Sequence, residues 1–291
     1  HMKTKSKLGL KNGIKKSDAL WARALKVIAT GTQTFSRSPG VFPDGAAPKY
    51  VVRQQGSHVL DVDGNEFIDM VMGCGPTTLG HNCEPVNAAI KAQLEKGILF
   101  SLLNPLEVEV AEKLVDLIPC ADMVKFSKNG SDVCAAAIRL SRAVTGRDQV
   151  FCYGYHGFQD WYIGSTDRTA GVPKAVRELT TPFQYNDIPG LKKLFEAHRG
   201  QVAALIMEPV IGEKPKPDYL RQVKALPVEA QAAIGAVGRW ACMRSGLYFE
   251  ADSGDWTRVL GACSDIRSNG PKIAAVDGAK AQGLVGEQGD G

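Results

Sequence analysis

Apolar residues near the start of the chain first follow a helical spacing and then alternate as they do in strands. The helical spacing begins after Ser17, whose hydroxyl can accept a hydrogen bond from a first-turn amide and so cap a helix. Three short strands are predicted after a Pro- and Gly-rich stretch, at residues 50–52, 58–62 and 66–70. Asp63-Gly64-Asn65 supplies the positive φ of a tight hairpin turn between the last two strands. These elements predict a small N-terminal lobe.

From Gly80 onward, predicted helices alternate with predicted strands. Helical spacings lie at residues 85–96, 105–118, 131–144 and 187–200, and a weaker one lies at 227–237. Apolar strand patterns lie at residues 124–126, 149–153 and 202–207. Strands separated by amphipathic helices predict an α/β fold, with a mainly parallel sheet and helices on both of its faces.

Composition excludes several classes of protein without indicating an activity. The chain has 291 residues, of which 44% are hydrophobic and 23% charged, so collagen, coiled coil and general disorder do not describe it. This length is sufficient to bury a sizeable core. No apolar run approaches the roughly 18 residues that a membrane helix needs, and no signal-peptide core is found, so we expect no membrane association.

The net charge of +4 comes from the N-terminal end. Six lysines precede Asp18, and without them 29 basic residues face 31 acidic ones, a balance of −2. We therefore expect residues 1–16 to form a basic flexible arm, which begins with His1-Met2, a pair typical of a cloning scar. Nucleic-acid binding by the folded body is disfavoured. The seven cysteines form no CxxC pair, which favours reduced thiols and a cytoplasmic location.

The first candidate site is a strand that leads through Gly130 into a helix predicted to begin at Ser131. A helix start offers unpaired amides and the positive end of the helix dipole, and Gly130 lets a ligand approach the backbone closely. With the hydroxyl of Ser131, this segment predicts a phosphate-binding cup. An ordinary capped helix would show the same pattern.

The second and third candidates follow two predicted strands. Tyr155 and His156 come directly after the strand at 149–153, where ligands of open α/β sheets bind. Tyr155 offers a flat face for a ring, although aromatic packing around a hydrogen-bonded histidine is the alternative. Glu208 ends the apolar strand at 202–207 and needs either a wet cleft or a basic partner. No group of residues has metal-ligand spacing, so we expect no metal site.

In this order, the three candidates resemble the class III branch of the fold-type I pyridoxal-phosphate aminotransferases, and within it the glutamate-1-semialdehyde 2,1-aminomutase-like group. The likeness runs from about Trp21 to about Lys224. Other similar stretches begin at Leu60, Leu79, Ala136, Gly171, Tyr185 and Ala203.

The resemblance implies a cofactor, pyridoxal 5'-phosphate, and residues that bind it. Gly130 and Ser131 would hold the phosphate, supported by Asn129 and by Asp132. Tyr155 would stack on the pyridine ring. His156 would lie beside Tyr155, and Glu208 would lie near the hydrogen-bond network of the cofactor.

Two further family residues are expected downstream of Glu208, and neither motif is found. One is an Asp that pairs with the pyridine nitrogen, and the other is the Lys that forms the Schiff base. Asp252 and Lys280 have about the right separation, but the flanking residues do not fit. The catalytic residues therefore stay unknown, with Lys280 as a weak candidate for the Schiff-base lysine.

The resemblance also implies a domain organisation. After the arm, residues 17–75 would form an N-terminal helix and a small β-meander lobe. Residues 76–225 would form part of the large cofactor-binding domain. Residues 226–291 have no recognised character, and the fold is expected to be incomplete at the C-terminus.

Two functions remain as hypotheses. The first is pyridoxal-phosphate-dependent amino-group transfer from a small-molecule amino donor to a carbonyl acceptor, by an aminotransferase or by an aminomutase of the glutamate-1-semialdehyde type. The family resemblance implies that such an enzyme is a homodimer. The second is a catalytically inactive, truncated or altered fragment that binds the cofactor or a partner without turnover.

Overall fold

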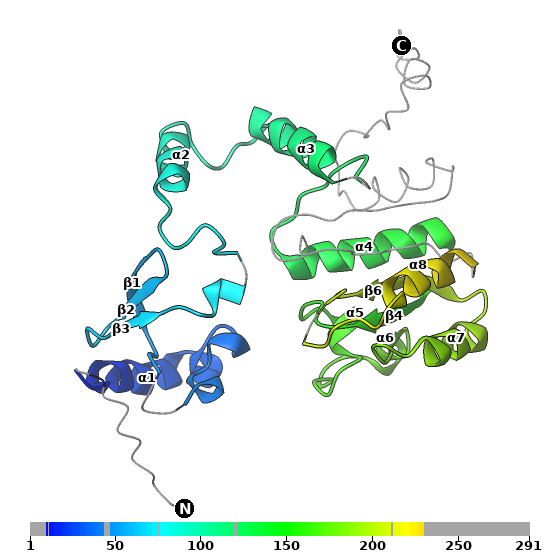
Figure 1. The fold of residues 1–291 in the computed structure, drawn as a ribbon, viewed down its shortest axis with the longest axis horizontal. Helices are drawn as coiled ribbons and strands as arrows, with labels where there is room; N and C mark the ends of the chain where they lie inside the picture. Colours follow the sequence, from blue (N-terminus) through cyan, green and yellow to red (C-terminus); the bar gives the residue numbers. More distant parts are fainter. Residues whose placement is uncertain are drawn as a thin grey trace, which may run out of the picture. The chain divides into compact units, whose positions relative to one another are not determined.

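The computed structural model describes residues 10, 12–43, 47–74, 76–118, 121–210 and 212–229. The chain divides into two compact units, His1–Leu102 and Leu103–Gly291, which Figure 1 shows as ribbons. Most of the predicted basic arm lies outside the described residues, as do Asp252, Lys280 and nearly all of the unrecognised segment 226–291.

The described part of the first unit contains a small antiparallel sheet and two α-helices. Its strands pair in the order β1-β2-β3, as the meander prediction requires, and Val59 lies opposite Phe67. Gly64 has a φ of +86°, which confirms the turn between the last two strands. The elements are α1 (Lys15–Val27), β1 (Val51–Gln55), β2 (His58–Asp61), β3 (Glu66–Ile68) and α2 (Glu84–Leu94), with short 3-10 turns at Ala29–Gly31, Phe35–Arg37, Pro39–Val41 and Met72–Cys74.

The prediction that Ser17 caps the first helix is wrong. Helix α1 begins at Lys15, so Ser17 lies inside its first turn and is buried. The cap comes from the hairpin turn instead, since the carboxylate of Asp63 accepts hydrogen bonds from the amides of Lys16 (2.7 Å) and Ser17 (2.9 Å). The Ser17 hydroxyl could accept a hydrogen bond from one unpaired first-turn amide, whereas the charged Asp63 carboxylate accepts from two.

Within the described residues, the second unit is built on a parallel three-stranded sheet. Strand β4 is central, with β5 and β6 as its parallel neighbours. The strands are β4 (Gln149–Tyr153), β5 (Thr180–Pro182) and β6 (Val202–Met207), and the helices are α3 (Pro105–Leu117), α4 (Gly130–Thr145), α5 (Asp160–Ile163), α6 (Lys174–Arg177), α7 (Ile188–Ala197) and α8 (Tyr219–Glu229).

Helices cover both faces of this sheet, as the sequence predicts. On one face, Val150 and Cys152 of β4 pack with residues of α4 and α5. On the other face, Phe151 packs with residues of α7 and α8. Successive residues of a strand point to opposite faces, and both faces are covered by helices. Strands β4 and β6 are therefore buried along almost their whole length.

Several predicted elements differ from the structure. The strand predicted at 124–126 is reduced to a single bridge residue, Lys125. Helix α8 begins at Tyr219, ahead of the helix predicted at 227–237, and Tyr219, Val223 and Leu226 form its buried stripe. Residues 230–237 of that prediction lie outside the described residues. Strand β5 was not predicted; its Pro182 suits an edge strand, which needs fewer donors.

None of the described helices combines the length and the apolar character that crossing a bilayer requires.

Candidate functional site

The second and third sequence candidates meet where β4 and β6 end. The strands are parallel, so their carboxyl ends lie at the same edge of the sheet. The amide of Glu208 donates to the carbonyl of Tyr153 (3.0 Å), and the amide of Tyr155 donates to the Glu208 carboxylate (2.8 Å). The aromatic loop after β4 and the acid after β6 therefore form one site.

The first candidate, the start of helix α4, has its own side-chain cap. The helix begins at Gly130, and the Asn129 side chain accepts a hydrogen bond from the amide of Asp132 (3.0 Å) while donating to its carboxylate (2.7 Å). The amides of Gly130 and Ser131 lie in the first turn, where no intrahelical carbonyl reaches them. They remain suited to an anion at the positive end of a 16-residue helix.

The start of α4 contacts the aromatic loop through Ser131. The Ser131 hydroxyl oxygen accepts a hydrogen bond from the amide of Phe158 (3.2 Å), and its hydrogen can still be donated to a ligand. Gly157 has a φ of +108°, and a Cβ at this position would lie 2.5 Å from Ser131 Cβ. Only a glycine permits this approach, so all three sequence candidates converge.

The ring of Tyr155 is presented to solvent at this edge. Its exposed fraction is 65%, and its ring contacts Tyr162 edge-on with the centroids 5.8 Å apart. The Tyr162 hydroxyl donates to the carbonyl of Gly154 (2.7 Å), which fixes the chain just before Tyr155. An accessible aromatic face of this kind can bind a planar ring.

The ring of His156, in contrast, is buried with an exposed fraction of 4%. Its Nε2 lies 2.9 Å from the Tyr153 carbonyl, which can only accept, so Nε2 carries the proton and Nδ1 is an acceptor. The ring stacks on Trp161 and meets Tyr162 edge-on. Burial lowers the pKa of His156 from 6.5 to about 4, so the imidazole is neutral at pH 7.

This neutral imidazole predicts a loss of stability in acid. The unfolded chain binds the proton near pH 6.5 and the folded chain near pH 4. Stability is therefore complete above pH 6.5 and falls between pH 6.5 and 4, by up to about 3 kcal/mol. Urea unfolding at pH 7.5 and 4.5 measures this loss in the wild type and in His156→Gln, whose amide can still donate to the Tyr153 carbonyl. The variant should lose less; an equal loss in both proteins would contradict the assignment.

Sequence reasoning missed several residues that shape the site. Gly154 and Gly157 flank the Tyr155–His156 pair, and these two glycines are a signal that is visible in the sequence. The structure gives both of them a positive φ. Tyr162 and Gln159 act over longer distances, and Gln159 donates to the Asp132 carboxylate (3.1 Å). No local pattern marks these contacts.

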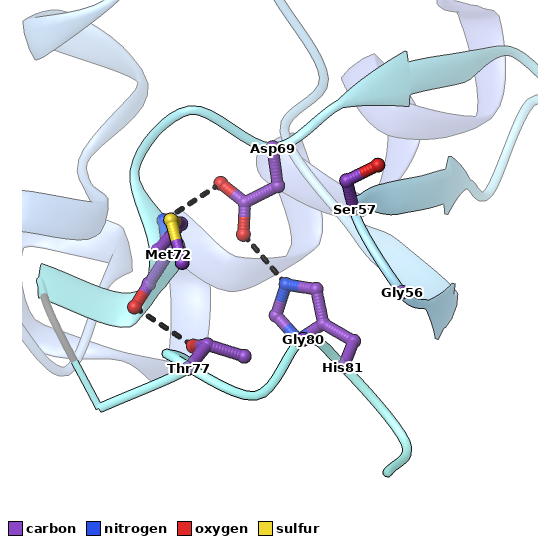
Figure 2. A pocket seen from close by; sticks show the side chains of 7 residues that line it. All are labelled: Gly56, Ser57, Asp69, Met72, Thr77, Gly80 and His81. Atoms are coloured by element: carbon purple, nitrogen blue, oxygen red, sulfur yellow. Dashed lines mark hydrogen bonds and ion pairs between the residues drawn. The ribbon is translucent and has the colours of Figure 1, made fainter.

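A separate cavity of about 70 Å³ lies in the first unit. Figure 2 shows the Asp69 carboxylate directed at the His81 ring, 2.6 Å from Nε2, and at the amide of Met72. Burial acts to raise the pKa of Asp69, but hydrogen bonds from His81 and from the amides of Met72 and Val71 outweigh it and hold the pKa below its usual value. Within the described part of the chain, neither this cavity nor any other place groups three potential metal ligands.

Comparison with known proteins identifies the family. The model of the class-III aminotransferases matches residues 43–234. The 3-aminobutyryl-CoA aminotransferase of Cloacimonas acidaminovorans is 31% identical over 280 residues, which cover 94% of this chain and 65% of that protein. A glutamate-1-semialdehyde 2,1-aminomutase of Lachnoclostridium phytofermentans is 34% identical over 226 residues, which cover 72% of this chain and 52% of that protein.

A solved structure supports the same relationship. The FumI protein of Sphingopyxis sp. MTA144, in its PLP internal aldimine form, superposes with a TM-score of 0.76 and 26% identity, covering 88% of this chain and 68% of that one. The chain thus spans half to two thirds of the length of the two curated relatives. It belongs to the class-III aminotransferase family.

Proposed function

We propose that this chain binds pyridoxal 5'-phosphate and takes part in the transfer of an amino group. The observation that carries the proposal is the convergence of the α4 start, the Ser131 hydroxyl and the exposed Tyr155 ring at one edge of the sheet. Family membership and the similarity to the FumI protein, solved in its PLP internal aldimine form, support the choice of cofactor.

The residues present fit the chemistry of this cofactor. Its phosphate suits the first-turn amides of Gly130 and Ser131 together with the free hydroxyl proton of Ser131. Asn129 supports this turn, because its side chain fixes the amide of Asp132. The pyridine ring of the cofactor suits the face of Tyr155. The buried ring of His156, in the same loop, packs against Tyr162 and is neutral.

When bound, the cofactor supplies an electron sink for the bond changes at the amino carbon of the substrate. The described residues bind and orient it. The α4 start fixes the phosphate end, and Tyr155 sets the plane of the ring. His156 holds its own proton on Nε2 toward the Tyr153 carbonyl, so it brings no positive charge into the site.

The substrates we propose are a small-molecule amino donor and a carbonyl acceptor. Relatives named as an aminotransferase and as an aminomutase support both reaction types. The second candidate function is cofactor binding without turnover. It is favoured by the absence of a recognised Schiff-base motif in the sequence, where Lys280 is the weak candidate.

Borohydride reduction separates the two functions. The purified chain is incubated with pyridoxal 5'-phosphate, reduced and digested, and the modified lysine is identified by mass spectrometry. Stoichiometric modification of one lysine supports a working transferase, and modification of Lys280 would identify it. Saturable binding without specific modification would favour the binding-only function. The absence of saturable binding would contradict both.

We further propose that the chain forms a homodimer. Helix α2 buries none of its residues within the described structure, and Leu99, which follows it in the same unit, is 94% exposed. Apolar surface of this kind is typical of an interface. Sedimentation equilibrium should give a dimer, and Leu99→Glu should shift it toward the monomer, whereas exposed Glu178→Ala should not. A monomeric wild type at micromolar concentration would contradict the proposal.

The cysteines support a proposed cytoplasmic location. Cys83 and Cys152 form no disulfide in the described part of the chain. Reduced thiols are usual in that compartment.

A further inference from the structure

We infer that Glu208 is a positioning residue that holds the Tyr155 ring in place through the main chain, and that it does not bind the cofactor itself. The inference rests on the proposed function, and it replaces a direct contact between the Glu208 carboxylate and the cofactor. The structure carries it in three steps.

The first step is that Glu208 is bonded to the loop after β4 from both its backbone and its side chain. Its amide donates to the Tyr153 carbonyl (3.0 Å), and its Oε2 accepts from the Tyr155 amide (2.8 Å). These two bonds lie on either side of Gly154. The end of β6 is thereby tied to the residues on both sides of Gly154, one of which is Tyr155 itself.

The second step is that the Glu208 side chain is packed tightly against Gly154. A Cβ on Gly154 would lie 2.5 Å from Oε2 and 2.8 Å from Cγ of Glu208. Gly154 also has a φ of +93°, which favours glycine. The Glu208 carboxylate therefore occupies space that any side chain on residue 154 would fill.

The third step is that little else described holds the Tyr155 ring. The ring is largely exposed, and its described ring contact is the edge of Tyr162. Its orientation depends on the backbone at Gly154 and Tyr155, which the Glu208 bond and the Tyr162–Gly154 bond fix. A hydrogen bond to a carboxylate is stronger than one to a neutral acceptor, so the negative charge of Glu208 stiffens this loop.

A double-mutant cycle in the full chain tests the inference, with pyridoxamine 5'-phosphate and inorganic phosphate as probes. Glu208→Ala and Tyr155→Ala should each weaken pyridoxamine phosphate binding about tenfold. The double variant should lose no more affinity than Tyr155→Ala alone. Glu208→Gln keeps a carbonyl acceptor and should lose about threefold or less. Phosphate binding should not change, and Glu178→Ala on an exposed helix end is the control.

Additive losses in the double variant, or an equal loss in Glu208→Gln and Glu208→Ala, would overturn the inference, because both indicate a direct contact. Hydrogen exchange of the Tyr155 amide in the ligand-free chain gives an independent readout. The amide of residue 155 should lose its protection in Glu208→Ala and keep it in Tyr155→Ala. Unchanged protection of this amide in Glu208→Ala would also overturn the inference. If the wild type binds no pyridoxamine phosphate, the proposed function fails, while the exchange result still decides the role of Glu208.

Discussion

Gly157→Ala is expected to weaken the binding of pyridoxamine 5'-phosphate by about 100-fold or more. The new methyl group would lie 2.5 Å from Ser131 Cβ and 2.8 Å from Ser131 Cα, and the φ of +108° is unfavourable for alanine. Backbone strain and overpacking together cost about 3 kcal/mol or more. The loop must therefore move away from the start of α4 and separate the two halves of the site. Isothermal titration calorimetry measures the change.

Gly171→Ala is the matched control for this prediction. Gly171 also has a positive φ (+85°), but a Cβ there would meet nothing within 4 Å. The control should lose about 1 kcal/mol of stability and keep its affinity. Wild-type affinity in Gly157→Ala would show that the contact between Gly157 and Ser131 does not form the site.

Phe151→Ala is expected to lower the free energy of unfolding by about 3–5 kcal/mol. Phe151 is fully buried on the central strand, and its ring meets Phe195 edge-on with the centroids 5.0 Å apart. Truncation would leave a cavity beneath α7 and α8, which neighbouring side chains fill only in part. Urea denaturation monitored by circular dichroism measures the loss.

Phe158→Ala makes the same chemical change at a position that is 70% exposed. Its effect on the free energy of unfolding should stay within about 0.5 kcal/mol. Equal losses in the two variants would contradict the assignment of Phe151 to the core.

The sequence predicted the parts of the fold that depend on local patterns. The continuous apolar run of β6 and the strand at Gln149–Tyr153 are visible as strands because they are buried on both faces. The helix after Asp187 was predicted from its cap, and the Asp187 side chain does accept a hydrogen bond from the amide of Gly190.

What local patterns could not predict depends on residues far apart in the chain. Ser17 has the residue type of a cap, but Asp63, 46 positions away, provides it. Glu208 could be placed at the end of its strand, but its bond to Tyr155 spans 53 positions. Such contacts become visible only once the strands are aligned in the sheet.

The same distinction applies to the candidate site. The residue types of Gly130, Ser131 and Tyr155 suit a phosphate and a ring. The way they meet depends on the approach of Gly157 to Ser131, which sequence alone does not reveal. Asn129, His156 and Glu208 were predicted as cofactor-binding residues, and we now propose that they support and position the residues that touch the ligand.

Pyridoxal phosphate is expected to bind where the start of α4 meets the loop after β4. Amide chemical shifts of the ¹⁵N-labelled chain, followed during titration with pyridoxamine 5'-phosphate, test it most directly. Saturable changes are expected, and they should be largest at Gly130, Ser131 and Tyr155. The absence of saturable binding, or changes centred on the Asp69–His81 cavity instead, would contradict it.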